Sequence, residues 1–107
     1  MVKHNQIVVV EPAGFAFAGA GVEYVSVLWS TVREVTAYKL DLITTDEVRL
    51  RLELDISPFS VEVAEEMEGF ESFKSAAERY FQFPEGWWSQ VIQPAFVTNA
   101  HVLFRRD

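Results

Sequence analysis

The chain has 107 residues, of which half are hydrophobic and 14% aromatic, so it can bury one core and is too apolar to be disordered. Its formal net charge of -7 argues against nucleic acid, anionic membranes and lipid headgroups as partners, because like charges repel. The absence of cysteine excludes disulfides, thiol catalysis and cysteine-ligated zinc. The apolar run at 7–10 is too short for a signal peptide or a membrane span. We therefore expect a single domain over residues 1–107, located in the cytoplasm.

The first half of the chain predicts short strands. Residues 6–10, 15–18 and 24–29 are β-branched or alternate in polarity, and glycine- or proline-containing turns separate them. The three-residue spacing of Trp29, Val32 and Val35 predicts one helical or irregular turn, which Ser30 or Thr31 could cap. The chain then extends again over 36–43.

The clearest strand follows in the segment EVRLRLELD. Its leucines and Val48 point to one side and its charged residues to the other, as in an antiparallel sheet with one face on a core and one in water. The segment 59–63 alternates again and continues the meander. The charged face is either self-neutralising or a charged contact surface; it comprises Glu47, Arg49, Arg51, Glu53 and Asp55.

The periodicity changes to three and four after Glu65, which predicts a helix over 66–83. Its expected apolar stripe consists of Met67, Phe70, Phe73, Ala77, Tyr80 and Phe81. The glutamates at 65, 66 and 68 would complement the dipole at the start of this helix. A proline at 84 predicts the first position of a second, shorter helix over 84–92, and a last strand is expected over 101–106.

Catalytic motifs are not found. The segment Gly19–Tyr24 lacks the third glycine and the following helix of a nucleotide-binding loop. The glutamates between 62 and 71 are expected to fan outward along a helix, and His4 and His101 have no acidic neighbours in sequence. We therefore predict no catalytic residues, no metal site, no cofactor and no enzymatic activity.

Most aromatic residues follow residue 64, and they are the candidate binding residues: Trp87, Trp88, Tyr80, Phe83 and Phe96. Adjacent helical residues point about 100° apart, so we expect one of the two tryptophans to be exposed. Two interpretations remain open, core filling and a surface for self-association or a protein partner. A third, an apolar pocket for a small molecule, would be lined by Phe83, Trp88 and Phe96.

The segment VEYVSVLWSTVREVTAYK resembles the strand, tryptophan and turn passage of bacterial PH-like (pleckstrin-homology-like) domains. The matching positions are Trp29, Val32, Val35 and Lys39, and the segments DLITTDEVRLRLEL and EEMEGFESFKSAAERYF look like the meander and helix of that fold. The loops EPAG and GAGVE lack the basic residues with which PH domains bind phosphoinositides. The resemblance therefore implies a scaffold for protein contacts, with no catalytic residues to transfer.

Together these observations predict an α+β domain. We expect a strongly bent antiparallel sheet of six to seven strands, a PH-like partial barrel, capped by one long C-terminal helix and a short second helix. The expected function is that of a non-enzymatic protein-interaction domain, adaptor-like or immunity-like, with homodimerisation left open. The alternative is a small-molecule binder with an apolar pocket.

Overall fold

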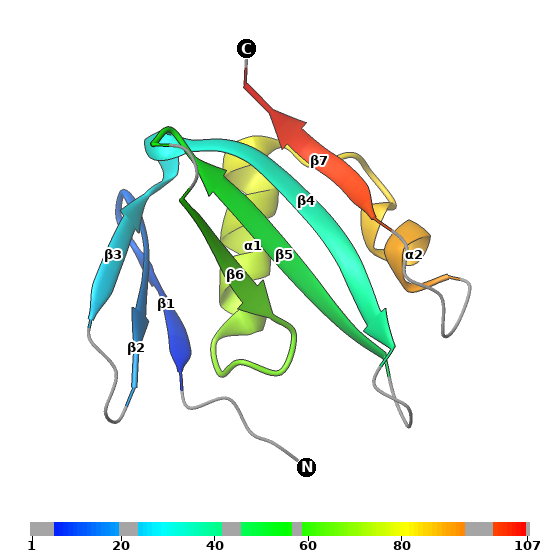
Figure 1. Ribbon diagram of the computed structural model, residues 1–107, viewed down its shortest axis with the longest axis horizontal. Coiled ribbons are helices and arrows are strands. Elements are labelled where there is room, and N and C mark those ends of the chain that lie inside the picture. Colours follow the sequence, from blue (N-terminus) through cyan, green and yellow to red (C-terminus); the bar gives the residue numbers. More distant parts are fainter. Residues whose placement is uncertain (1–5, 20–23, 42–45, 57–58, 94–99, 107) are drawn as a thin grey trace.

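The strands of this chain form two antiparallel sheets that lie against two α-helices (Figure 1). The computed structural model describes residues 6–19, 24–41, 46–56, 59–93 and 100–106. The first sheet has the order β1-β2-β3 and the second the order β6-β5-β4-β7. In chain order the elements are β1 (Ile7–Glu11), β2 (Gly14–Ala18), β3 (Val25–Leu28), the 3-10 turn η1 (Trp29–Thr31), β4 (Val32–Asp41), β5 (Asp46–Leu54), β6 (Ser60–Ala64), α1 (Phe70–Phe81), α2 (Trp87–Ile92) and β7 (His101–Arg105).

The α+β class, the antiparallel pairing and the single turn at Trp29 are confirmed, but one continuous bent sheet is not. The η1 turn redirects the chain from β3 into β4 and so separates the two sheets. Hydrogen bonds fix this corner on both sides: Trp29 N donates to Ala13 O at 3.0 Å, and Asp55 N donates to Thr31 O at 2.8 Å. The described strands do not close into a barrel.

One core lies between the two sheets and α1. The alternation predicted for β5 is confirmed, since Val48, Leu50 and Leu52 are buried and pack in this core with Phe73. The water-facing side of β5 has one exception. Glu47 is only 2% exposed, and its carboxylate accepts a 2.9 Å hydrogen bond from Arg49, which makes burial of the charge tolerable.

Both helices begin later than the sequence pattern predicts. Residues 65–69 form turns, and Gly69 with φ 89° precedes α1, so Met67 reaches the core without being helical. The glutamates at 65, 66 and 68 therefore lie before the helix; Glu65 accepts a hydrogen bond from Val48 N at 3.0 Å. Gln82, with φ 56°, ends α1. The second helix starts at Trp87 after Gly86 with φ 79°, so the proline at 84 lies outside it.

The first sheet is joined to the start of α1 by a close backbone contact. Val8 N donates to Glu68 O at 2.9 Å, and a Cβ atom on Gly69 would lie only 2.0 Å from Val8 O. Glycine is therefore required at 69 both by the positive φ and by the approach of β1.

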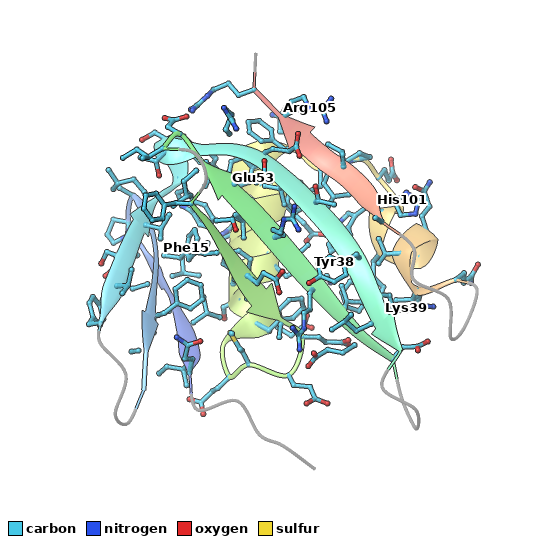
Figure 2. The ribbon with its side chains drawn as sticks, viewed as in Figure 1. Phe15, Tyr38, Lys39, Glu53, His101 and Arg105 are labelled. Carbon is cyan, nitrogen blue, oxygen red and sulfur yellow. The ribbon has the colours of Figure 1, made fainter. Side chains whose placement is uncertain are left out.

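The second sheet is joined to α2 by a buried lysine. Lys39 is 1% exposed; its Nζ donates to the carbonyl of Ile92 at 2.8 Å and lies 3.3 Å from Asp46. Figure 2 shows Lys39 at the end of the sheet next to α2. The cation meets the C-terminal end of a helix, where the helix dipole favours positive charge.

The last strand behaves as predicted. β7 pairs with β4 and forms an edge of the second sheet. No helix in the described ranges has the length and apolar character needed to cross a membrane.

Candidate functional site

A hollow of about 550 Å³ opens where the β1–β2 turn and η1 meet the last turn of α1. A second hollow of about 410 Å³ adjoins it along α1, because both are lined by Val10, Ala76 and Arg79. We call the larger hollow the hairpin–helix groove. Its lining consists of Val10, Glu11, Pro12, Ala13, Leu28, Trp29, Ser30, Ala76, Arg79 and Tyr80.

The base of this groove is a cluster of aromatic rings centred on Trp29. The indole lies 5.0 Å from the ring of Phe15 and 5.8 Å from that of Phe73, and its exposed fraction is 6%. Tyr80 stacks on it at 5.7 Å with an interplanar angle of 22° and remains 53% exposed. The sequence places the tryptophan at the end of β3 and the tyrosine in the last turn of α1, so the corner at η1 brings them together.

Opposite charges border the groove. Glu11 accepts a hydrogen bond from the hydroxyl of Tyr24, and this bond raises the pKa of the Tyr24 phenol. Arg79, from α1, lines the groove and forms no ion pair with any described residue. An apolar hollow with a carboxylate and a guanidinium at its border can hold an apolar side chain together with flanking polar groups, but it contains no nucleophile with an adjacent base.

Of the predicted binding residues that the structure describes, only Tyr80 lines this groove. Trp87 is 3% exposed, its Nε1 donates to Glu78 at 2.8 Å, and Phe83 contacts its ring edge-on at 5.5 Å. These contacts explain Trp87 as a residue that joins α2 to α1. Its polar nitrogen has the partner that a buried indole requires.

Trp88 and Phe83 are half-buried in the same layer. Lys74 Nζ lies 4.7 Å from the Trp88 ring, a cation–π contact, and Phe70 lies 6.2 Å from it. Phe83 stacks on Phe81 at 6.0 Å. The two adjacent tryptophans differ in exposure, since Trp87 is buried and Trp88 is half-buried. Phe96 lies outside the described residues.

The outer face of the second sheet carries the predicted ion pairs. Arg49 contacts Glu47 at 2.9 Å and Glu62 at 3.6 Å, and Arg51 contacts Glu53 at 3.4 Å. In Figure 2, Tyr38 and Glu53 lie on this face, which is turned away from α1.

The same face holds a perturbed phenol. Tyr38 donates to Glu62 at 2.8 Å, and burial together with this bond raises the pKa of the phenol. The charges of this face are thus largely satisfied within it.

Metal-binding side chains do not converge. Within the described ranges, no group of three or more histidine, aspartate or glutamate residues is placed to hold a metal ion. His101 lies on β7, and His4 and the segment 20–23 of the glycine-containing turn lie outside the described residues.

Sequence reasoning missed Val10, Leu28 and Arg79 as groove residues. Leu28 gives the clearest retrospective signal. It follows Ser26 by two positions, so both side chains face the solvent-exposed side of β3, where a leucine that is 52% exposed adds little to the core. Comparison with protein-family models, curated proteins and solved structures gave no match, so the functional argument rests on this geometry.

Proposed function

We propose that this chain is a non-enzymatic protein-interaction domain, of adaptor or immunity type, which binds a protein partner at the hairpin–helix groove. The observation that supports the proposal is the exposed apolar border of the groove. Val10, Leu28 and Tyr80 are 38%, 52% and 53% exposed around a tryptophan that is already packed. Exposed tyrosine and aliphatic side chains around a hollow are typical of surfaces that anchor a partner's side chain.

The proposed partner presents one apolar side chain that lies over Trp29 between Leu28 and Tyr80. Glu11 and Arg79 border the groove and would set the orientation of that partner through charge, while contributing less to affinity than the apolar contact. The net charge of -7 would steer a basic partner toward the domain. We place the domain in the cytoplasm as part of this proposal, in keeping with its lack of cysteine.

The fold relationship belongs to the same proposal. We propose that the domain is PH-like, because the meander β4–β5–β6 is followed by a helix and Trp29 lies at the corner before β4. Lipid headgroups and nucleic acid are not proposed as ligands, since Arg79 is the single cation among the described residues that line the groove, and the chain is acidic.

A small molecule in a pocket lined by Phe83, Trp88 and Phe96 is the weaker alternative. The rings of Phe83 and Trp88 already contact Phe81, Trp87 and Phe70 at 5.5–6.2 Å. The observed contacts favour packing over ligand binding at the two described members of this set.

The test compares wild type with Tyr80→Ala and with Phe59→Ala as immobilised baits in native host lysate. Phe59 is a matched control, since it is aromatic, 63% exposed and does not line the groove. We expect one stoichiometric protein to be retained by wild type and by Phe59→Ala, and to be lost with Tyr80→Ala at an unchanged melting temperature. Retention by all three baits, or by none, would contradict the proposal.

A further inference from the structure

The two sheets diverge between β3 and β6, and this opening contains a third hollow, separate from the hairpin–helix groove. Its volume is about 250 Å³, and it is lined by Gln6, Phe17, Val25, Val61 and Glu62. We call this region the β3–β6 seam. In Figure 1, β6 is the strand of the second sheet that lies toward the first sheet. The hollow is smaller than a typical drug-sized site and has room for side chains.

On one side of the seam, β3 has an unpaired edge. Glu11 and Gly14 flank a two-residue turn, so these two residues form a hydrogen-bonded pair between β1 and β2. Hydrogen-bonded and non-hydrogen-bonded pairs alternate along an antiparallel ladder. The N–H and C=O groups of Phe15 and Phe17 therefore point away from β1 and toward β3. Their partners on β3 are Val27 and Val25, so the N–H and C=O of Ser26 point away from the sheet. By this alternation neither group of Ser26 takes part in the β2–β3 ladder, and the turn, loop and cap hydrogen bonds between described residues do not involve it.

The edge of β6 is also open but is better protected. Leu54 N donates to Phe59 O and Glu65 N to Val48 O, which places Ser60 and Glu62 on the outward-facing side of β6. The charge of Glu62 guards this edge against pairing with another strand, a common device in natural sheets.

By contrast, β3 has no such protection. Its four residues carry no charge and no proline, and Val25 and Leu28 are 44% and 52% exposed. Tyr24, directly before it, is 57% exposed. An uncharged, exposed edge of this kind is a ready template for an added strand.

We propose that the β3–β6 seam binds an extended, positively charged segment of another protein, which adds to β3 as a fourth strand of the first sheet. Its backbone pairs with Ser26, and its inward-facing apolar side chains fill the hollow beside Phe17, Val25 and Val61. Among the described residues that line this hollow, Glu62 alone is charged, and its contact with Arg49 at 3.6 Å offsets part of that charge. The acidic character of the seam also reflects the net charge of -7 and the absence of lysine and arginine from β3 and β6. A segment in which valine, isoleucine or alanine alternates with lysine or arginine therefore complements the seam.

The proposed occupant is a separate polypeptide, and its binding at the seam is independent of the hairpin–helix groove. A peptide occupies only the width of one strand beside β3. A second copy would bring another chain of net charge -7 to the same place and is the less favourable occupant.

The experiment screens a display library of random peptides of about ten residues against the full chain. We expect enriched peptides that alternate apolar and basic residues. Their affinity is then measured for wild type, Ser26→Pro and Ser60→Pro. Proline at 26 removes an N–H that the ladder alternation directs away from β2, so we expect the fold to be retained while strand addition at β3 is blocked. The matched proline at 60 perturbs the opposite edge in the same way.

Binding lost with Ser26→Pro and retained with Ser60→Pro supports the proposal. If Ser26→Pro lowers the melting temperature, Val25→Lys replaces it; we expect this cation in the seam to weaken binding at least about tenfold. The proposal is overturned if binding survives Ser26→Pro, if only Ser60→Pro abolishes it, or if no peptide is enriched. A dimer would also overturn the proposal. Wild type is examined by analytical ultracentrifugation from about 1 µM to about 500 µM. If it dimerises in this range and Ser26→Pro abolishes the dimer, the occupant of the seam is a second copy.

Discussion

Replacing Gly69 with alanine should destabilise the fold much more than the same change at Gly86. Both glycines precede a helix with similar positive φ angles of 89° and 79°. Their surroundings differ, since a Cβ atom at 69 would lie 2.0 Å from Val8 O, whereas one at 86 meets nothing within 4 Å. The pair therefore separates the effect of backbone conformation from the effect of the close approach.

The magnitude follows from these distances. Alanine at either position adopts a left-handed conformation that costs about 1–2 kcal/mol, partly offset by a lower entropy of the unfolded chain. At 69 the backbone of β1 must also retreat by about 1.5 Å to restore an ordinary contact. That movement breaks the adjacent 2.9 Å bond from Val8 N to Glu68 O. We estimate an additional loss of about 2–4 kcal/mol from the lost bond and the overpacking.

The assay is urea unfolding of Gly69→Ala, Gly86→Ala and wild type, followed by circular dichroism. We expect Gly69→Ala to lose at least about 2 kcal/mol more unfolding free energy than Gly86→Ala, which is a further drop of about 10 °C in melting temperature. A difference below about 0.5 kcal/mol would refute the contact between β1 and the start of α1.

Three further outcomes are expected. Leu52→Asp should unfold the domain, because a fully buried position cannot accommodate an unpaired charge. Arg51→Ala, on the opposite face of β5, should change stability by less than about 1 kcal/mol. Equal melting temperatures for these two variants would contradict the sheet assignment. Lys39→Ala should cost about 2–4 kcal/mol and speed hydrogen exchange in α2, since the carbonyl of Ile92 loses its cation; unchanged exchange there would argue against this role. The pKa of the Tyr38 phenol is raised in the folded state, so at pH above about 10 the unfolded state loses this proton first and the free energy of unfolding falls as pH rises. In Tyr38→Phe this fall should be smaller. Urea unfolding curves recorded at about pH 9–11 measure it.

The strands and the core were predictable because their signals are local. The alternation of Val48, Leu50 and Leu52 reports directly which face is buried, and the structure confirms it. The boundaries of α1 were not predictable from the same kind of signal. The helical spacing of apolar residues includes Met67, yet α1 begins only after Gly69. At Gly69 the backbone of β1, from a distant part of the sequence, comes so close that the chain is not helical there.

The candidate site was less predictable than the fold. Tyr80 belongs to the apolar stripe expected for the helix, but it lies 53% exposed on Trp29 because η1 turns the chain beside the last turn of α1. Sequence spacing shows which helical residues share a face, and it does not show where the neighbouring sheet ends. Trp87 shows the converse, since an apolar residue expected at a binding surface is buried through its bond to Glu78.

The arrangement of the first sheet also has a consequence for local unfolding. Its three strands come from one continuous stretch, residues 7–28. Its backbone hydrogen bonds to the rest of the described fold lie at the η1 corner and at Glu68, while side chains such as Phe15 pack in the shared core. Such a unit can open as a separate foldon at a lower free energy than global unfolding. Opening would remove Phe15 from Trp29, which lies 5.0 Å away, while Trp87 would stay packed against Glu78. The emission of Trp29, isolated by replacing the other two tryptophans with phenylalanine, would then report the detachment of this sheet before the second sheet melts.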